Sequence, residues 1–97
     1  MDIEVSELKE RMDKNEALNI IDVREIWEYE EANIGAKNVP LATLPHQLDD
    51  FEDWKEKEVI VHCKSGRRSA QAQQFMEQNG FENVRNLVGG IDAYLAE

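Results

Sequence analysis

The sequence predicts an α/β fold, a small parallel sheet of about five strands with helices on both faces. Three observations support this fold class. Two short apolar and β-branched runs, residues 18–23 and 58–62, lack a clean alternation of apolar and polar positions, which is typical of strands buried on both faces. Helical patterns separate and follow these runs, and glycine or proline marks the turns. Strands that alternate with helices usually form a parallel sheet.

The first elements along the chain are a helix and a strand. Ser6 is a candidate N-cap for a helix that carries Leu8 and Met12 on one face. The apolar run at residues 18–23 then predicts a short buried strand. Residues 24–32 are short and rich in charge, and we expect them to form one or two helical turns.

The middle of the chain contains weaker signals. Gly35 and Pro40 mark turns, and residues 38–39 indicate a weak strand between them. Pro45 suits the first turn of a helix, because its missing N–H is not needed there. The apolar residues of that helix are Leu48, Phe51 and Trp54.

The second half of the chain predicts a strand, a tight loop and a helix. The strand at residues 58–62 runs directly into the loop at 63–68, and residues 69–79 contain good helix formers. Gly80 is a natural residue to follow the end of that helix. Residues 84–87 predict a further short strand. A turn and a last amphipathic segment follow, with Gly89, Gly90, Ile91, Tyr94 and Leu95.

Length and charge narrow the class of function. A chain of 97 residues, 41% of them hydrophobic, is expected to form one domain over residues 1–97 with a modest core. Its 11 basic and 21 acidic side chains give a formal net charge of −10. That charge opposes the phosphates of nucleic acids and the anionic surface of membranes. We therefore expect a monomer that binds neither nucleic acid nor a membrane.

Signals for targeting and for metal binding are missing from the sequence. No run approaches the roughly 18 apolar residues of a spanning helix, and the N-terminus lacks the order of a signal peptide. The one cysteine, Cys63, cannot form an intramolecular disulfide, which suits a reducing compartment, so we expect a cytoplasmic protein. His62 adjoins Cys63 in a predicted strand and points to the opposite face, while His46 lies in another segment. We expect no metal and no cofactor.

The loop after the strand at 58–62 is the candidate site. Ligands bind at the carboxyl ends of strands in open α/β sheets, and Cys63 stands at such an end. Ser65 and Gly66 form a turn signal, so that successive backbone N–H groups can surround an anion. The next helix adds the positive end of its dipole. Three cations lie within five positions, Lys64, Arg67 and Arg68.

These features together indicate a reactive thiol. A helix N-terminus and nearby cations lower the pKa of a cysteine and favour the nucleophilic thiolate, so Cys63 is a candidate nucleophile. The alternative is that Cys63 is a small buried hydrophobe that ends a strand, and that the cations form a solvated basic turn. The combination of strand, cysteine, glycine and two arginines favours the first interpretation.

Four segments resemble motifs of the rhodanese (sulfurtransferase) family, and together they cover nearly the whole chain. They occur in the family's order and at the spacing of a single domain, which makes the resemblance specific. The segments are Ile21-Asp22-Val23-Arg24-Glu25 with Trp27-Glu28-Tyr29, Ile34-Gly35-Ala36-Lys37-Asn38-Val39-Pro40, Cys63-Lys64-Ser65-Gly66-Arg67-Arg68-Ser69, and Leu87-Val88-Gly89-Gly90-Ile91.

The resemblance implies a chemistry for the loop. Cys63 would take a sulfur from a small anionic donor such as thiosulfate, become a persulfide, and pass the sulfur to cyanide, a thiol or a protein. The backbone N–H groups of residues 64–68 would hold the persulfide. Lys64 and Arg67 would receive the donor's anionic group, and Arg68 either joins them or braces the loop. The substrate-binding residues are then Lys64, Ser65, Gly66, Arg67 and Arg68.

The chain departs from the family pattern outside this loop. Where many members have Gly-His-Ile and a further residue before Gly-Ala, residues 32–36 read Ala-Asn-Ile-Gly-Ala, and Tyr94 stands where tryptophan is common. We expect Asp22 and Arg24 to tie the strand end to neighbouring loops. The aromatic residues that we expect to pack, and not to contact substrate, are Trp27, Trp54, Phe75 and Tyr94.

Two alternatives come from other classes of function. Phosphatases related to rhodanese use a longer loop with arginine six positions after the cysteine, where this chain has Ser69. The other alternative is a non-catalytic rhodanese-like binding or sulfur-carrier module. The acidic runs at residues 25–31 and 49–58 could steer a basic protein in either case, although such runs are usually solvated faces.

Overall fold

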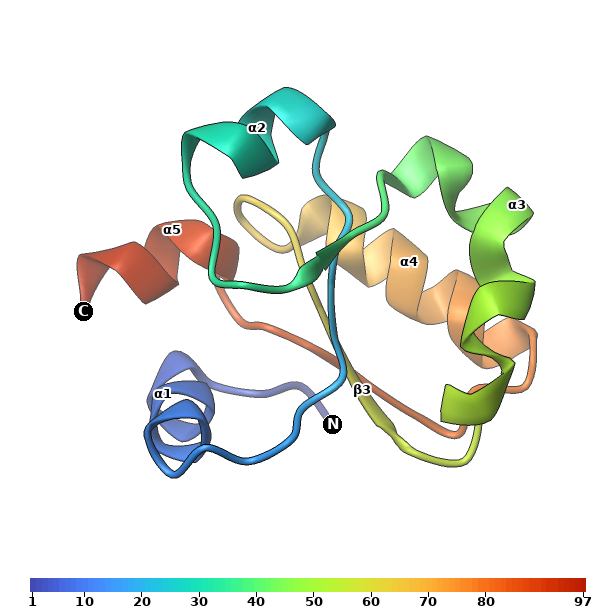
Figure 1. Cartoon of the computed structure of the whole chain (residues 1–97), viewed down its shortest axis with the longest axis horizontal. Coiled ribbons are helices and arrows are strands. Elements are labelled where there is room, and N and C mark those ends of the chain that lie inside the picture. Colours follow the sequence, from blue (N-terminus) through green and yellow to red (C-terminus); the bar gives the residue numbers. More distant parts are fainter.

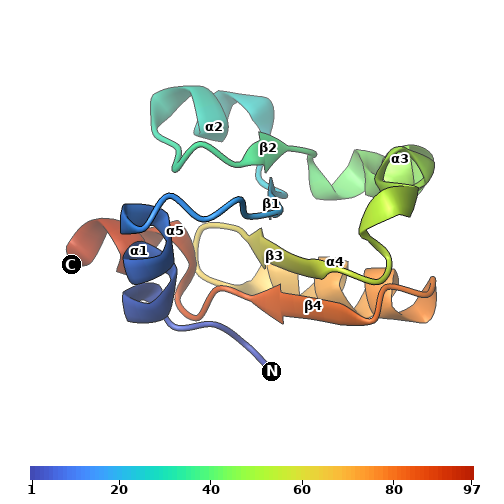
Figure 2. The ribbon, with the colours of Figure 1, turned by 60° about the horizontal axis from the view of Figure 1, so that its bottom comes forward.

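A parallel sheet of four strands, in the order β2–β1–β3–β4, organises the chain (Figures 1 and 2). The computed structural model describes all 97 residues. The strands are β1 (Ile20–Asp22), β2 (Lys37–Asn38), β3 (Glu58–His62) and β4 (Asn83–Asn86). The helices are α1 (Val5–Asp13), α2 (Ile26–Glu31), α3 (Leu44–Gln47), α4 (Arg67–Gln78) and α5 (Gly90–Ala96), with the 3₁₀ helices η1 (Leu41–Thr43) and η2 (Leu48–Trp54).

The fold class predicted from the sequence is confirmed, with four strands instead of about five. All pairs are parallel, and the centre of the sheet is β3, which pairs with β1 on one side and β4 on the other. Beyond β4 the sheet continues only as an isolated bridge between Ile3 and Leu87. The chain turns into α1 just after Ile3, so no fifth strand develops.

Successive residues of the central strands face opposite sides of the sheet, which explains why both faces are covered. Val59 and Val61 of β3 belong to a core formed with α3, η2 and α4. Ile60, between them, belongs to a second core formed with α1 and α5. This two-sided burial is the reason that the strands read as continuous apolar runs.

Several element boundaries differ from the sequence-based ones. Helix α1 begins at Val5 with Glu4 as its N-cap, so the prediction of Ser6 as N-cap was wrong. Helix α4 begins at Arg67, two residues before the predicted start. The segment after Pro45 is a short α-helix that continues as the 3₁₀ helix η2, with the core residue Phe51 at the kink.

Helix α2 differs from the other α-helices because it buries none of its residues. It lies beyond the carboxyl ends of the strands, close to the loop between β3 and α4 (Figures 1 and 2). No helix of the structure combines the length and the apolar composition needed to cross a membrane.

Candidate active site

Cys63 lies directly after β3 and opens the loop that leads into α4. Gly66 has φ +111°, a left-handed conformation that other residues rarely adopt, and it is the N-cap of α4. This turn folds the loop back over the sulfur and brings the Gly66 backbone nitrogen to 3.0 Å from Cys63 Sγ. Cys63 is only 1% exposed and belongs to the core on one face of the sheet.

Hydrogen-bond donors around the sulfur favour the thiolate. Burial alone would raise the pKa of the Cys63 thiol, but the Ser69 hydroxyl and the backbone N–H groups of Ser69, Gly66 and Ser65 outweigh it. The net result is a pKa below the usual value for cysteine. The sequence predicted the role of the backbone N–H groups and of the helix start. It did not predict the contribution of the Ser69 hydroxyl.

Ser69 and Asn86 form a buried pair that sequence reasoning missed. The Ser69 hydroxyl lies 3.3 Å from Cys63 Sγ and 2.6 Å from Asn86 Oδ1. Asn86 also donates from Nδ2 to the Gly66 carbonyl at 3.1 Å, which holds the loop to the end of β4. A signal was available, since Asn86 ends the strand next to β3, and neighbouring parallel strands deliver their carboxyl ends to one site.

The start of α5 supports the back of the loop. The Ile91 N–H donates to the Cys63 carbonyl at 2.9 Å, and the Asp92 N–H donates to the Lys64 carbonyl at 3.1 Å. A Cβ at Gly90 would lie 2.5 Å from the Cys63 carbonyl oxygen and 2.4 Å from that of Lys64. Only glycine allows this close approach, so Gly90 of the 87–91 motif lets the start of α5 lie directly against the active loop.

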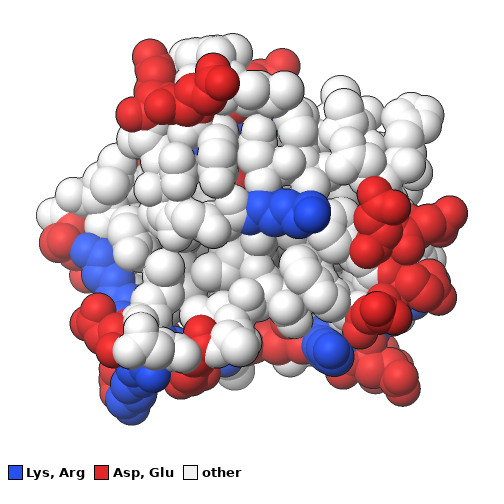
Figure 3. Space-filling view, viewed as in Figure 1, with Lys and Arg blue, Asp and Glu red and all other residues white.

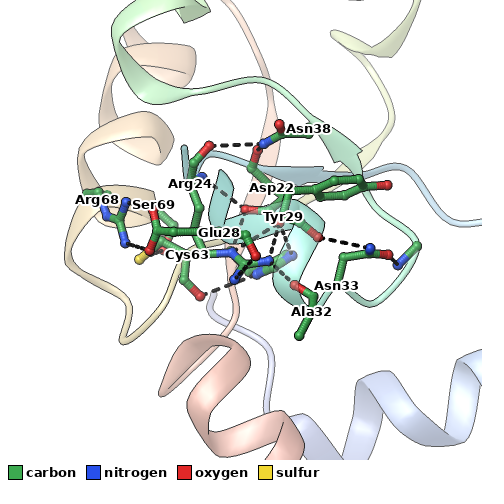
Figure 4. A network of polar contacts seen from close by, with 12 residues as sticks. Asp22, Arg24, Glu28, Tyr29, Ala32, Asn33, Asn38, Cys63, Arg68 and Ser69 are labelled. Carbon is green, nitrogen blue, oxygen red and sulfur yellow. Dashed lines mark hydrogen bonds and ion pairs between the residues drawn. The ribbon is translucent and has the colours of Figure 1, made fainter. Parts of the chain in front are cut away.

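The three cations of the loop have separate surroundings. Lys64 pairs with Asp92 of α5, with Nζ–O distances of 3.0 and 3.1 Å. Arg68 forms a two-point ion pair with Glu28 of α2, at 2.6 and 2.9 Å (Figure 4). Arg67 is exposed and forms no ion pair. Of the two roles expected for Arg68, the structure therefore favours bracing over direct contact with a donor.

The Glu28 carboxylate is held in its charged form by this contact. The hydrogen bond from Arg68, opposed by burial and supported by the Glu25 N–H, lowers the pKa of Glu28 to about 2. The pair therefore persists throughout the neutral range, and α2 stays attached to the first turn of α4.

Asp22 and Arg24 form a buried ion pair at the end of β1, with Nη2–Oδ2 at 2.8 Å (Figure 4). The same guanidinium donates to the backbone carbonyls of Glu28 and Ala32, which closes α2 onto the sheet. The structural role expected for this pair agrees with these contacts. His62 is fully buried beside it, with Nε2 3.7 Å from Asp22 Oδ2, and burial lowers the pKa of its ring.

The aromatic residues expected to pack divide into two groups. Trp54 and Phe75 pack against the core that contains Cys63, and Tyr94 packs against the other core. Trp27 does not pack, because its side chain on α2 is 62% exposed. The prediction for Trp27 was wrong. Helix α2 is attached by its arginine contacts, which leaves its tryptophan free of the core.

Comparison with known proteins identifies relatives over almost the whole chain. A family model described as the rhodanese-like domain matches residues 4–97. YrkF of Bacillus subtilis, named as a sulfur carrier protein, is 38% identical over 91 residues, which cover 93% of this chain and 48% of YrkF. A tRNA uridine(34) hydroxylase of Erwinia tasmaniensis is 33% identical over 97 residues, which cover 95% of this chain and 27% of the hydroxylase. This chain thus spans about half and about a quarter of these two relatives.

Other relatives match along nearly their full length. A sulfurtransferase of Allochromatium vinosum is 31% identical over 94 residues, which cover 96% of this chain and 86% of that protein. The crystal structure of SSP1007 from Staphylococcus saprophyticus superposes with a TM-score of 0.86 at 39% identity, covering 96% of this chain and 91% of that one.

Proposed function

The chain belongs to the rhodanese-like domain family, and on that premise we propose that it is a sulfurtransferase that carries a sulfane sulfur on Cys63. The donor is a small anion such as thiosulfate, and the acceptor is cyanide, a thiol or a protein. The observation that carries this proposal is the set of hydrogen-bond donors around Cys63 Sγ, which favours an enclosed thiolate at the start of a helix.

The first transfer loads the enzyme. The Cys63 thiolate attacks the outer sulfur of thiosulfate, the S–S bond of thiosulfate breaks, and sulfite leaves with the electron pair. The product on the protein is a Cys63 persulfide with one negative charge. The N–H groups that favour the thiolate suit this anion as well, because they require no rearrangement to receive its charge.

The second transfer regenerates the thiolate. A nucleophilic acceptor attacks the outer sulfur of the persulfide, the S–S bond breaks, and Cys63 leaves as a thiolate that the same donors stabilise. No oxidant or reductant is consumed, because the sulfane sulfur moves with its oxidation state unchanged. Two half-reactions through one covalent intermediate predict ping-pong kinetics.

The other loop residues have distinct roles in this proposal. Arg67, exposed and free of ion pairs, receives the anionic group of the donor, and Lys64 assists when it leaves Asp92. Ser65 and Gly66 supply backbone N–H groups, and Arg68 fixes the loop to α2. We assign residues 1–97 to one domain and expect it to act in the cytoplasm, where reducing conditions keep the thiol available.

A carrier role is the second candidate, and the name of YrkF favours it. A carrier accepts sulfur once and waits for a specific partner, whereas an enzyme turns over with small acceptors. A phosphatase role is disfavoured by the length of the loop. A phosphoryl group needs donors for three oxygens, and the position of the arginine required in the related phosphatases is occupied by Ser69, which faces the sulfur and Asn86.

The persulfide itself provides the test. After incubation with thiosulfate and no acceptor, mass spectrometry should find one added sulfur atom on the peptide that contains Cys63. Addition of cyanide should remove it and start multiple turnovers. Cys63→Ser and Cys63→Ala should lose both results while keeping the circular dichroism spectrum of the wild type.

The outcomes separate the candidates. Loading without turnover on any small acceptor would support the carrier. Absence of the added sulfur with every donor, or undiminished turnover in Cys63→Ala, would exclude sulfur transfer at this residue. A Cys63-dependent hydrolysis of an aryl phosphate would reverse the choice of reaction class.

A further inference from the structure

Helix α2 presents apolar side chains to solvent next to the active loop. Ile26 is 60% exposed and Trp27 62%, and Leu95 of α5, across from them, is 61% exposed. These residues line two clefts. One, of about 280 Å³, lies between α2 and α5, and the other, of about 500 Å³, lies between α2 and residues 40–43. Trp27 lines both clefts and thus stands between them.

The exposure of these side chains is not required by the fold. Helix α2 has no buried residue and is attached by the contacts of Arg24 and Arg68 to Glu28 and Ala32. A tryptophan on such a helix contributes almost nothing to the core. Large exposed apolar groups beside a cleft are typical of a surface that another molecule covers.

The charged residues around these clefts indicate the charge of the molecule that covers them. Glu25, Glu30 and Glu31 are exposed and form no ion pair, and they surround Trp27. Figure 3 shows acidic side chains gathered over α2 at the top of this view. Nucleic acids and anionic membranes are repelled by this rim. A second copy of the chain, with a net charge of −10, is repelled as well.

The smaller cleft leads to the active loop. Lys64, the residue after Cys63, lines it together with Asp92 and Glu28. Lys64 forms an ion pair with Asp92, and Glu28 forms one with Arg68. A polypeptide seated on Trp27 and Leu95 therefore lies beside Lys64, the residue that follows Cys63 in the active loop.

We propose that the α2–α5 face, formed by Ile26, Trp27 and Leu95 with Glu25, Glu30 and Glu31, binds the sulfur acceptor. The acceptor is a positively charged polypeptide segment that carries a cysteine close to an aliphatic or aromatic side chain. The apolar side chain fills a cleft beside Trp27, and the basic residues meet the three glutamates. The acceptor thiolate attacks the outer sulfur of the Cys63 persulfide, the S–S bond breaks, and the acceptor leaves as a persulfide. This inference rests on the proposed sulfur transfer.

The test compares acceptors of equal length that differ in charge. Three short peptides, each with one cysteine and one leucine, carry either Lys and Arg, or Ser, or Glu at the other positions, and dithiothreitol serves as a small acceptor. With the loaded wild type, kcat/KM should be about tenfold higher or more for the basic peptide than for the acidic one, and the difference should shrink in high salt. Equal values for the three peptides would overturn the proposal.

Variants locate the effect on the surface. Trp27→Ala, and separately the double variant Glu30→Gln with Glu31→Gln, should remove most of the preference and leave transfer to dithiothreitol unchanged. Asp49→Asn with Asp50→Asn removes the same charge from η2, at the right of Figure 3, and should keep the preference. Retention of the preference in both α2 variants, or an equal loss in the η2 control, would contradict the proposal.

A binding measurement tests the proposed surface without requiring sulfur transfer at Cys63. The basic peptide with serine in place of cysteine is titrated into Cys63→Ala protein, and backbone amide shifts are followed by NMR. Changes at residues 25–31 and 91–95 would support the surface even if no donor loads Cys63. Changes elsewhere, no changes, or a dimer in sedimentation that Trp27→Ala dissociates would exclude this face as an acceptor site.

Discussion

Ser69 has one hydroxyl proton and two acceptors within reach, Cys63 Sγ at 3.3 Å and Asn86 Oδ1 at 2.6 Å. It can donate to only one of them at a time. When Cys63 is a thiolate, the negative sulfur is the stronger acceptor. When Cys63 is protonated, or its charge has moved to a bound sulfur, the Ser69 hydroxyl can donate its hydrogen bond to Asn86 Oδ1 instead. Rotation about the Cβ–Oγ bond of Ser69 is enough to switch the hydrogen bond between these two acceptors.

Replacement of this hydroxyl provides the prediction at this scale. Ser69→Ala should raise the pKa of Cys63, because a hydrogen bond to a charged group contributes about 1.5–3 kcal/mol and the thiolate loses one. Alkylation by iodoacetamide near neutral pH should slow by about tenfold, and the ultraviolet absorbance of the thiolate should titrate at higher pH. Ser65→Ala, which keeps its backbone N–H, is the control and should leave the titration unchanged. The same midpoint in Ser69→Ala and wild type would refute this role.

Sequence reasoning identified Cys63 but missed its partners, for a physical reason. The position of Cys63 follows from a strand, a turn glycine and a helix, all of which are local signals. The contact with Ser69 depends on which side of α4 faces the sheet at its first turn, and the contact with Asn86 depends on the register of β3 with β4. Neither is visible in the neighbouring residues.

At the scale of elements, the active loop is held by three neighbours. The end of β4 binds the Gly66 carbonyl through Asn86, the start of α5 binds the carbonyls of Cys63 and Lys64, and α2 binds Arg68. These contacts occupy Arg68 in bracing and place Lys64 beside Asp92. Arg67 is the one cation of the loop that forms no ion pair.

Substitutions of Lys64 and Arg67 should therefore differ in their effect on the KM for thiosulfate. Arg67→Gln should raise KM for thiosulfate more than Lys64→Gln does, by several-fold, since Lys64 must first leave its carboxylate partner. Neither change should have a comparable effect on an uncharged persulfide donor. Steady-state kinetics with both donors provide the measurement. An equal rise of KM for the charged and the uncharged donor would show that these side chains do not bind the anion.

The elements themselves were largely predictable, whereas most of their boundaries were not. The strand at β3 was predicted with its observed bounds, because it is a short apolar run with charge on either side. The surroundings of α2 were not predicted. An isolated Ile-Trp pair in a short helix usually marks a buried face, and only the arginine contacts from β1 and α4 show that this helix can stay attached without one.

At the scale of the whole molecule, Glu58 connects three parts of the chain. It begins β3 and forms a two-point ion pair with Arg11 of α1, at 2.7 and 2.9 Å, and another contact with Arg85 of β4 at 2.8 Å. The hydrogen bond from Arg11, opposed by burial and supported by Arg85, lowers the pKa of Glu58 to about 2. The N-terminal helix is thereby fixed to the centre and to one edge of the sheet.

This network predicts how stability depends on pH. Because the pKa of Glu58 is lower in the folded state, its contribution is complete above the unfolded value of 4.5 and is lost as the pH falls through about 2. Glu58→Gln should reduce the free energy of unfolding at neutral pH by about 1–2 kcal/mol, discounted for partial exposure. The difference in unfolding free energy between Glu58→Gln and wild type should vanish near pH 2, where Glu58 itself is protonated. Urea unfolding at several pH values measures it.

The matched control removes the same charge two residues earlier. Glu56 is exposed and forms no ion pair, so Glu56→Gln should change stability little at any pH. A loss in Glu58→Gln that persists unchanged at the acid limit would show that the ion pairs are not its cause.

The absence of buried residues on α2 has a consequence for how such a protein can change. Substitutions in a core alter stability and specificity together, so each gain in partner choice risks a less stable fold. Here the exposed positions of α2 can mutate while the sheet, both cores and the loop after β3 keep their sequence. Duplicated copies of this gene could therefore diverge in partner choice through a few residues of one short helix, as long as Glu28 and the two arginines that hold it are retained.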